Sequence, residues 1–337
     1  MTYDEIMEQI KSGLTGDKEK DLKYIKEQQE LYKDHELAQE ILRGCGRLMF
    51  ELLPEEAQKE LSNAINADRV KLTSTLDEFH FALYKKDFAR AESIIVPVVE
   101  QADNLHMFEN DSVSEYFCWE EFFEEVLLRE VRKSDFTIRH AEYPYAQIYL
   151  NYGSFLFELG KYEEAHEQLR KAMRWNPVRC EIRFEYMETI KQRGDTEEYG
   201  HLAEESFQYA FRPQTLARCY RNMGWYFADK KMYNEAMTCY QLSSQFVQQN
   251  PAAASEMYWI LLQDPNAKPM TAEEFKPTAE QYNIPIGPDG RVLGLAFSLG
   301  KMFNERGNKE AAKYCFEIIY DLVGGDELKK LIDELSE

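Results

Sequence analysis

The sequence predicts an all-helical protein built from repeated helical hairpins, and three observations lead to this fold class. Helix breakers are scarce, with 16 glycines and 11 prolines among 337 residues. Apolar residues recur three and four positions apart, which is the spacing that places side chains on one face of a helix. One pattern of large and small residues also returns along the chain, and internal repeats of this kind are typical of a solenoid.

The charge and the composition disfavour several classes of partner and location. The formal net charge is -21, so phosphates would repel the chain and we expect no nucleic-acid partner. An anionic membrane surface is disfavoured for the same reason. The first residues, with Asp4, Glu5 and Glu8, lack the basic flank of a secretory signal, and no run has the roughly 18 apolar residues of a membrane span. With six cysteines and no C-x-x-C pair, the sequence predicts a cytoplasmic protein.

Residues 1–70 predict an N-terminal helical cap or bundle. Two amphipathic helices are expected over residues 17–34 and 36–53, and Pro54 is expected to begin a third that continues toward Asn66. A first hairpin should follow, with one helix over residues 75–85 and a second marked by Phe88, Ala91 and Ile95.

The repeats are clearest within residues 71–262, with one more copy at 292–337. In each copy a small residue is expected to let the second helix of the hairpin approach, and Gly160 and Gly307 are expected to end first helices in a left-handed conformation. Pro177 is expected to begin the next helix. A weaker copy has nine residues from Gly194 to Ala203, against five from Gly160 to Ala165, which predicts a longer second helix there. The three clear copies contain Tyr149, Tyr152, Gly153, Leu156, Gly160, Ala165 and Leu169; Tyr220, Met223, Gly224, Phe227, Ala236 and Tyr240; and Ala296, Leu299, Gly300, Phe303, Gly307, Ala312 and Phe316.

Two stretches interrupt the repeats. Ser112 and Glu115 have the spacing of a capping box, and aromatic residues follow at helical intervals, so we expect an aromatic helix over 112–133. It is either a degenerate repeat inside the stack or a helix in or over the binding groove. Residues 263–291 hold five prolines and predict a Pro-rich linker, either a surface connection or a lid, with a short helix capped by Thr271 and Glu274. A capping helix over 327–335 is expected to close the solenoid.

The repeated pattern resembles the tetratricopeptide repeat (TPR), in which W-x2-L-G-x2-Y is followed by A-x3-F and a proline. The resemblance, to a bacterial-type TPR protein, implies a right-handed α-α superhelix whose first helices line a concave groove. Carried onto this chain, the motif's ligand-facing positions give a candidate ligand-binding set: Asn151, Arg218, Arg221, Asn222 and Trp225.

Arg218, Arg221 and Asn222 form a basic, polar cluster that could hold a carboxylate. This partly resembles TPR proteins that clamp an acidic peptide end, but Glu181 and Glu185 stand where those proteins have basic groups. The alternative is that the arginines pair with glutamates of the neighbouring helix.

The sequence therefore predicts a non-catalytic scaffold that binds a protein or peptide, including one with an acidic or carboxylate end, in the groove. No phosphate loop, nucleophile motif or helical histidine pair is present, so we predict no catalytic residue, metal or cofactor. One alternative is a peptide-sensing regulator, since Rap-type phosphatases also place a helical bundle before TPR repeats. A second alternative is an enzyme whose site lies between the aromatic helix and the groove.

Overall fold

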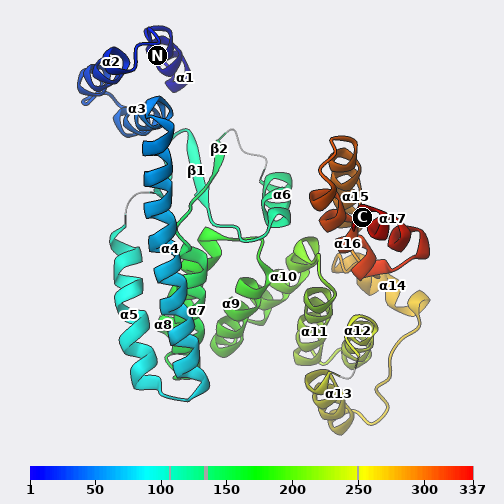
Figure 1. Ribbon diagram of the computed structural model, residues 1–337. Coiled ribbons are helices and arrows are strands. Elements are labelled where there is room, and N and C mark those ends of the chain that lie inside the picture. Colours follow the sequence, from blue (N-terminus) through cyan, green and yellow to red (C-terminus); the bar gives the residue numbers. More distant parts are fainter. Residues whose placement is uncertain (106–107, 133–135, 249, 337) are drawn as a thin grey trace. The chain divides into compact units, whose positions relative to one another are not determined.

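The computed structural model describes residues 1–105, 108–132, 136–248 and 250–336, without the side chains of 61–69. Regular structure in these ranges is almost entirely helical (Figure 1), which confirms the predicted all-α class. Contacts divide the chain into two units. Unit 1 comprises Met1–Cys118 and Arg132–Tyr152, and unit 2 comprises Trp119–Val131 and Gly153–Glu337.

Unit 1 begins with a small helical bundle formed by α1 (Tyr3–Ser12), α2 (Lys18–Leu31) and α3 (Ala38–Leu52). Its core includes Ile10, Ile25 and Ile41, all of which are buried. Helices α2 and α3 confirm the two amphipathic helices expected there. Helix α1 was not expected, although the sequence contains its signal: Thr2 and Glu5 form a capping box.

The first repeat-like hairpin pairs α4 (Glu55–Tyr84) with α5 (Phe88–Asn104). The prediction of one helix ending near Asn66 and another over residues 75–85 was wrong, because α4 is continuous. No glycine or proline lies between Pro54 and Pro97 to end it. The expected domain boundary at residue 70 consequently falls inside a helix.

The aromatic segment is not one helix from 112 to 133. Residues Ser114–Phe117 form strand β1, which pairs in parallel with β2 (Thr137–His140), and the helix α6 (Phe122–Val131) lies between them in sequence. Residue 133 lies outside the described residues. The predicted capping box does not form, because Glu115 pairs with Arg132 through two hydrogen bonds of 2.7 Å.

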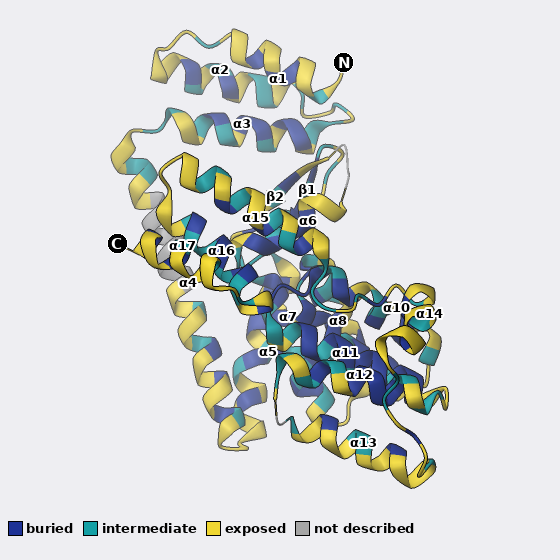
Figure 2. Ribbon diagram, turned by 90° about the vertical axis from the view of Figure 1, so that its right-hand side faces the viewer, coloured by how far each residue is buried: buried dark blue, intermediate teal, exposed yellow. Residues whose placement is uncertain are grey.

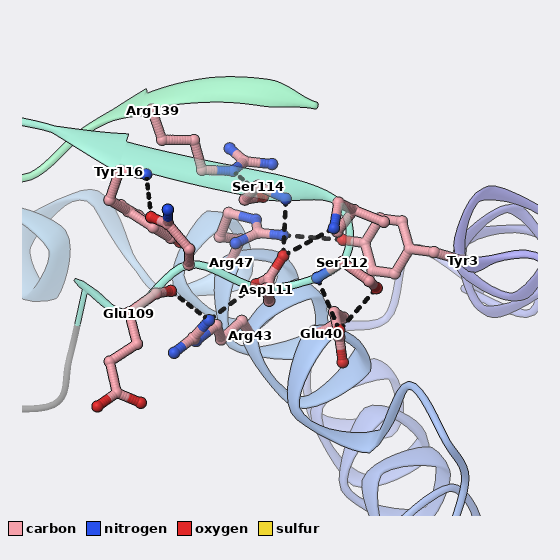
Figure 3. A network of polar contacts seen from close by, with 12 residues as sticks. Tyr3, Glu40, Arg43, Arg47, Glu109, Asp111, Ser112, Ser114, Tyr116 and Arg139 are labelled. Atoms are coloured by element: carbon pink, nitrogen blue, oxygen red, sulfur yellow. Dashed lines mark hydrogen bonds and ion pairs between the residues drawn. The ribbon is translucent and has the colours of Figure 1, made fainter. Parts of the chain in front are cut away.

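A polar network explains why the local capping signal is overridden (Figure 3). Ser112 donates from its backbone and its hydroxyl to the Glu40 carboxylate, over 3.0 and 2.7 Å. Arg43 donates to the Asp111 carboxylate (2.8 Å) and to the carbonyl of Glu109 (2.7 Å). These bonds join α3 to the segment before β1. Because the Ser112 side chain binds Glu40, it does not cap a helix.

Unit 2 contains the clear repeats from Gly153 onward. The second half of α7 (Tyr145–Glu158) belongs to it, and consecutive helices then follow: α8 (Tyr162–Trp175), α9 (Cys180–Arg193), α10 (Thr196–Ser206) with the 3-10 turn η2 (Phe207–Tyr209), α11 (Pro213–Asp229), α12 (Tyr233–Phe246) and α13 (Pro251–Gln263). A Cβ at Gly224 would lie 2.9 Å from the Tyr240 ring. The expected role of the small residue is therefore confirmed. Gly160 and Gly307 also have the expected positive φ, 74° and 76°.

Two local predictions in this unit were wrong. Helix α9 begins at Cys180 and not at Pro177, because the Asn176 side chain accepts from the Arg179 backbone and makes a turn first. The second helix of the weaker repeat, α10, has 11 residues against 14 in α8, so it is shorter. Position 199, five residues after Gly194, holds a buried tyrosine, and the extra spacing to Ala203 does not lengthen the helix.

The C-terminal part comprises α14 (Ala272–Gln281), α15 (Gly290–Glu305), α16 (Lys309–Val323) and α17 (Asp326–Ser336). The Thr271–Glu274 capping box and the closing helix are confirmed. The expected linker at 263–291 is more than a surface connection, because Phe275 and Ile284 are buried. The Tyr220 hydroxyl also donates to the Pro285 carbonyl over 2.6 Å, which fixes this segment to α11.

Candidate functional site

The predicted arginine cluster lies on α11, beside α9. Arg218 donates to the Glu188 carboxylate of α9 over 2.8 Å and to the Asn222 side chain over 3.1 Å. For Arg218, therefore, the interpretation that the arginines pair across neighbouring helices is right. Glu185, on the same face of α9, accepts from the Ser154 hydroxyl over 3.4 Å, and burial raises its pKa.

Arg221 has a different environment. Its guanidinium donates to the buried Ser243 hydroxyl over 3.2 Å, and no carboxylate pairs with it among the described residues. Burial, followed by the nearby charge of Arg218, lowers the pKa of Arg221. The charge of Arg221 acts electrostatically on the Tyr240 hydroxyl. This hydroxyl is buried and has no hydrogen-bond partner in the described part of the chain.

The other predicted site residues divide into two groups. Asn222 is buried beneath the cluster, with its amide nitrogen 3.8 Å from the Met187 sulfur, so its side chain is not open to a ligand. Trp225 is half-buried between the ring of Tyr199, at 4.3 Å, and the ammonium of Lys191, at 4.5 Å.

Asn151 belongs to unit 1. It is buried and accepts from the Gln147 amide over 2.8 Å. The structure therefore brings together Arg218, Arg221, Asn222 and Trp225 on one helix and leaves Asn151 in the other unit.

Sequence reasoning missed two residues of α12 beside Arg221, Ser243 and Tyr240, and one of α13, Glu256, which lies near Tyr240. Glu256 acts electrostatically on the buried Tyr199 and Tyr240 hydroxyls. Tyr240 was identified only as a packing residue of its repeat, and neither Ser243 nor Glu256 belongs to the repeat pattern. The cluster thus combines one paired arginine, one arginine without a carboxylate partner and a buried hydroxyl.

Helix α6 lies at the N-terminal ends of α9 and α11. Glu124 accepts from the Asn176 amide over 2.9 Å, just before α9, and Phe123 packs on Phe211, just before α11. Glu121 pairs with Arg212 and accepts from the Tyr314 hydroxyl of α16. These contacts tie α6 to both first helices and to the C-terminal hairpin.

The described part of the chain holds no group of three or more His, Cys, Asp or Glu side chains suited to a metal ion. None of the helices in the described ranges has the length and apolar content needed to cross a bilayer. All six cysteines are buried, and none of them forms a disulfide in the described part of the chain.

Residues 146–179, which span α7, α8 and the turn before α9, match the family model of the tetratricopeptide repeat. The chain contains a tetratricopeptide repeat. This TPR unit coincides with the first of the three copies found in the sequence.

Fifteen chains of solved structures match this chain. One comes from the functional characterization of Pseudomonas aeruginosa PilF, with 14% identity and a TM-score of 0.41; the match covers 78% of this chain and 96% of that one. Another comes from the APC/C hetero-tetramer Cut9–Hcn1, with 13% identity and a TM-score of 0.34; it covers 88% of this chain and 56% of that one. No curated protein matches the chain.

Proposed function

We propose that unit 2 is a protein-interaction module that binds a segment of another protein along α9 and α11, with Arg221 holding a carboxylate of that segment. The observation that carries the proposal is the half-buried guanidinium of Arg221, which has no carboxylate partner among the described residues. A charge held away from water without a partner costs free energy, and a bound carboxylate would recover it. Stacked helical repeats offer extended surfaces suited to such segments.

The surroundings of Arg221 indicate which ligand chemistry fits. A guanidinium binds a carboxylate through two parallel hydrogen bonds. Glu185 and Glu188, on the neighbouring α9, would repel a second acidic group. We therefore expect a ligand with one carboxylate at Arg221 and neutral or basic residues toward α9, and not a uniformly acidic peptide.

The test is selection from a displayed library of random short peptides with free C-termini, using the immobilised full-length protein. Wild type should enrich peptides that share a carboxylate at one position. Arg221→Gln should lose this enrichment, whereas Arg170→Gln should keep it, because Arg170 is an exposed arginine paired with Glu167 on α8. Enrichment of the same peptides by Arg221→Gln would show that the cluster is structural.

The peptide-sensing regulator stays a prediction. The bundle α1–α3 does precede the repeats, as that alternative requires. No contact of the described residues favours a signalling partner over any other protein, so the geometry supports a scaffold better than a regulator.

A further inference from the structure

Helix α13 carries a concentration of exposed apolar side chains. Tyr258 is 65% exposed and Leu262 is 62% exposed, and Trp259 and Leu261 are exposed beside them. We call these four residues the α13 patch. The opposite side of the helix is anchored by Ala253 and Ile260, which are buried, and the outer side is open along its length (Figure 2). Exposed apolar groups gathered on one element mark an interaction surface more often than isolated ones do.

The patch lies where the repeat architecture would place another helix. In the described hairpins a first helix packs against a second, as α11 does with α12 and α15 with α16. Helix α13 packs against both α11 and α12, so it occupies the position of the next first helix. The helix that follows, α14, packs against α12. No second helix among the described residues therefore covers the outer side of α13.

Charged residues are scarce in this part of the chain. Between Glu235 and Asp264 the only charged residue is Glu256, although 30% of the whole sequence is charged. Glu256 is half-buried and acts on the buried hydroxyls of Tyr199 and Tyr240. The exposed face of α13 is consequently uncharged in a molecule whose net charge is -21.

We propose that the α13 patch pairs two copies of this chain, helix against helix, about a two-fold axis. Two molecules of charge -21 repel each other, and the repulsion is smallest where the approaching surfaces carry no charge. A basic partner would instead be attracted to the acidic surface and would gain nothing electrostatically from an uncharged patch. Two-fold pairing is also the commonest form of self-association, since one patch serves both molecules.

The geometry of the helix suits this pairing. The 13 residues of α13 span about 20 Å at 1.5 Å per residue. Tyr258, Leu261 and Leu262 have the spacing i, i+3 and i+4, so they form one stripe. Antiparallel pairing about a two-fold axis would place this stripe against its own copy and bury it from both sides.

Sedimentation equilibrium over a range of concentrations and salt tests the proposal. Wild type should show reversible association toward twice the chain mass of 39.7 kDa, strengthened by salt because salt screens the repulsion. The double variant Tyr258→Glu/Leu262→Glu should sediment as a monomer, a twofold fall in mass. Ile286→Glu/Val323→Glu, which adds the same charge at two exposed apolar positions outside the patch, should still associate.

A charge-reversal experiment identifies the partner surface. Tyr258→Lys/Leu262→Lys should be monomeric alone and should form a mixed dimer with the glutamate variant. Circular dichroism should show all variants folded, since both substituted side chains are exposed. A wild type that stays monomeric at every concentration overturns the proposal, as does a dimer that survives both glutamates or a lysine–glutamate mixture that does not associate.

Discussion

Glu124 is a carboxylate that lies almost wholly inside unit 2. One of its oxygens accepts from the Glu120 backbone and from the Asn176 amide, both over 2.9 Å. Burial nonetheless raises the pKa of Glu124 above its ordinary value of 4.5, because desolvation outweighs these hydrogen bonds. Because the pKa of Glu124 is raised in the folded state, the contribution of this residue to stability is present at low pH. That contribution is lost as pH rises through the folded-state pKa.

The raised pKa of Glu124 predicts how its replacement changes stability with pH. Glu124→Gln should keep an acceptor for both hydrogen bonds while removing the buried charge. The free energy of unfolding of the variant, relative to wild type, should rise as pH increases above 4.5, by about 1.4 kcal/mol for each unit of raised pKa. Urea unfolding across acidic to neutral pH measures it, with Glu125→Gln on the same helix as control. A difference that does not change with pH would contradict the account.

Gly294 and Gly300 of α15 give a matched pair. A Cβ at Gly300 would lie 2.7 Å from the Phe316 ring, whereas a Cβ at Gly294 meets nothing within 4 Å. Gly300→Ala should lower the free energy of unfolding by about 1–3 kcal/mol through overpacking. Gly294→Ala should raise it by about 0.5–1 kcal/mol through helix propensity. Thermal unfolding distinguishes the two variants. If both substitutions shift the Tm in the same direction, α15 and α16 do not approach closely at Gly300.

These residues show what the sequence could and could not predict. The role of Gly300 follows from a repeat pattern in adjacent helices, so it was visible in sequence. The partner of Arg218 is Glu188, which lies on another helix. The sequence alone could not decide whether these two residues pair. Arg221 could be identified as a candidate, but its lack of a carboxylate partner is a property of the packed structure.

At the scale of elements, repeats were predictable and their interruptions were not. The hairpins are held by contacts between neighbouring helices, so composition and spacing predict them. Strands β1 and β2 pair across the intervening helix α6, and Ser112 bonds to Glu40, 72 residues away. Such long-range contacts leave no local pattern, and they convert an expected helix start into a strand.

Glu121, just before α6, anchors the C-terminal hairpin in unit 2. Because Glu121 bonds to both Arg212 and Tyr314, Glu121→Ala should loosen the attachment of α15 and α16 within unit 2. Hydrogen exchange should become faster in residues 290–323 and stay unchanged in α12. Glu125→Ala removes the same kind of side chain but only its pairing with Arg129 on α6. Equal effects of the two substitutions would show that Glu121 is not an anchor.

At the scale of the whole molecule, the chain forms two contact units that share helix α7. Arg43→Met should destabilise unit 1 by roughly 3 kcal/mol, because it removes the ion-pair partner of Asp111, whose side chain is only 4% exposed. Gly300→Ala acts in unit 2. Since the two sites share no partner, their effects in the double variant should add within about 0.5 kcal/mol. Chemical unfolding of the two single variants and the double variant checks this, and a larger deviation would show that the units are strongly coupled.

A double-mutant cycle can show whether Arg221 binds a carboxylate of a partner segment. The best peptide from the library is prepared as the acid and as the neutral amide, and calorimetry gives the affinity of each for wild type and Arg221→Gln. If Arg221 holds the carboxylate, its removal should weaken binding to wild type by at least about tenfold, or 1.4 kcal/mol, and should hardly change binding to Arg221→Gln. Equal losses in the two proteins would contradict the account, because the carboxylate would then be recognised elsewhere.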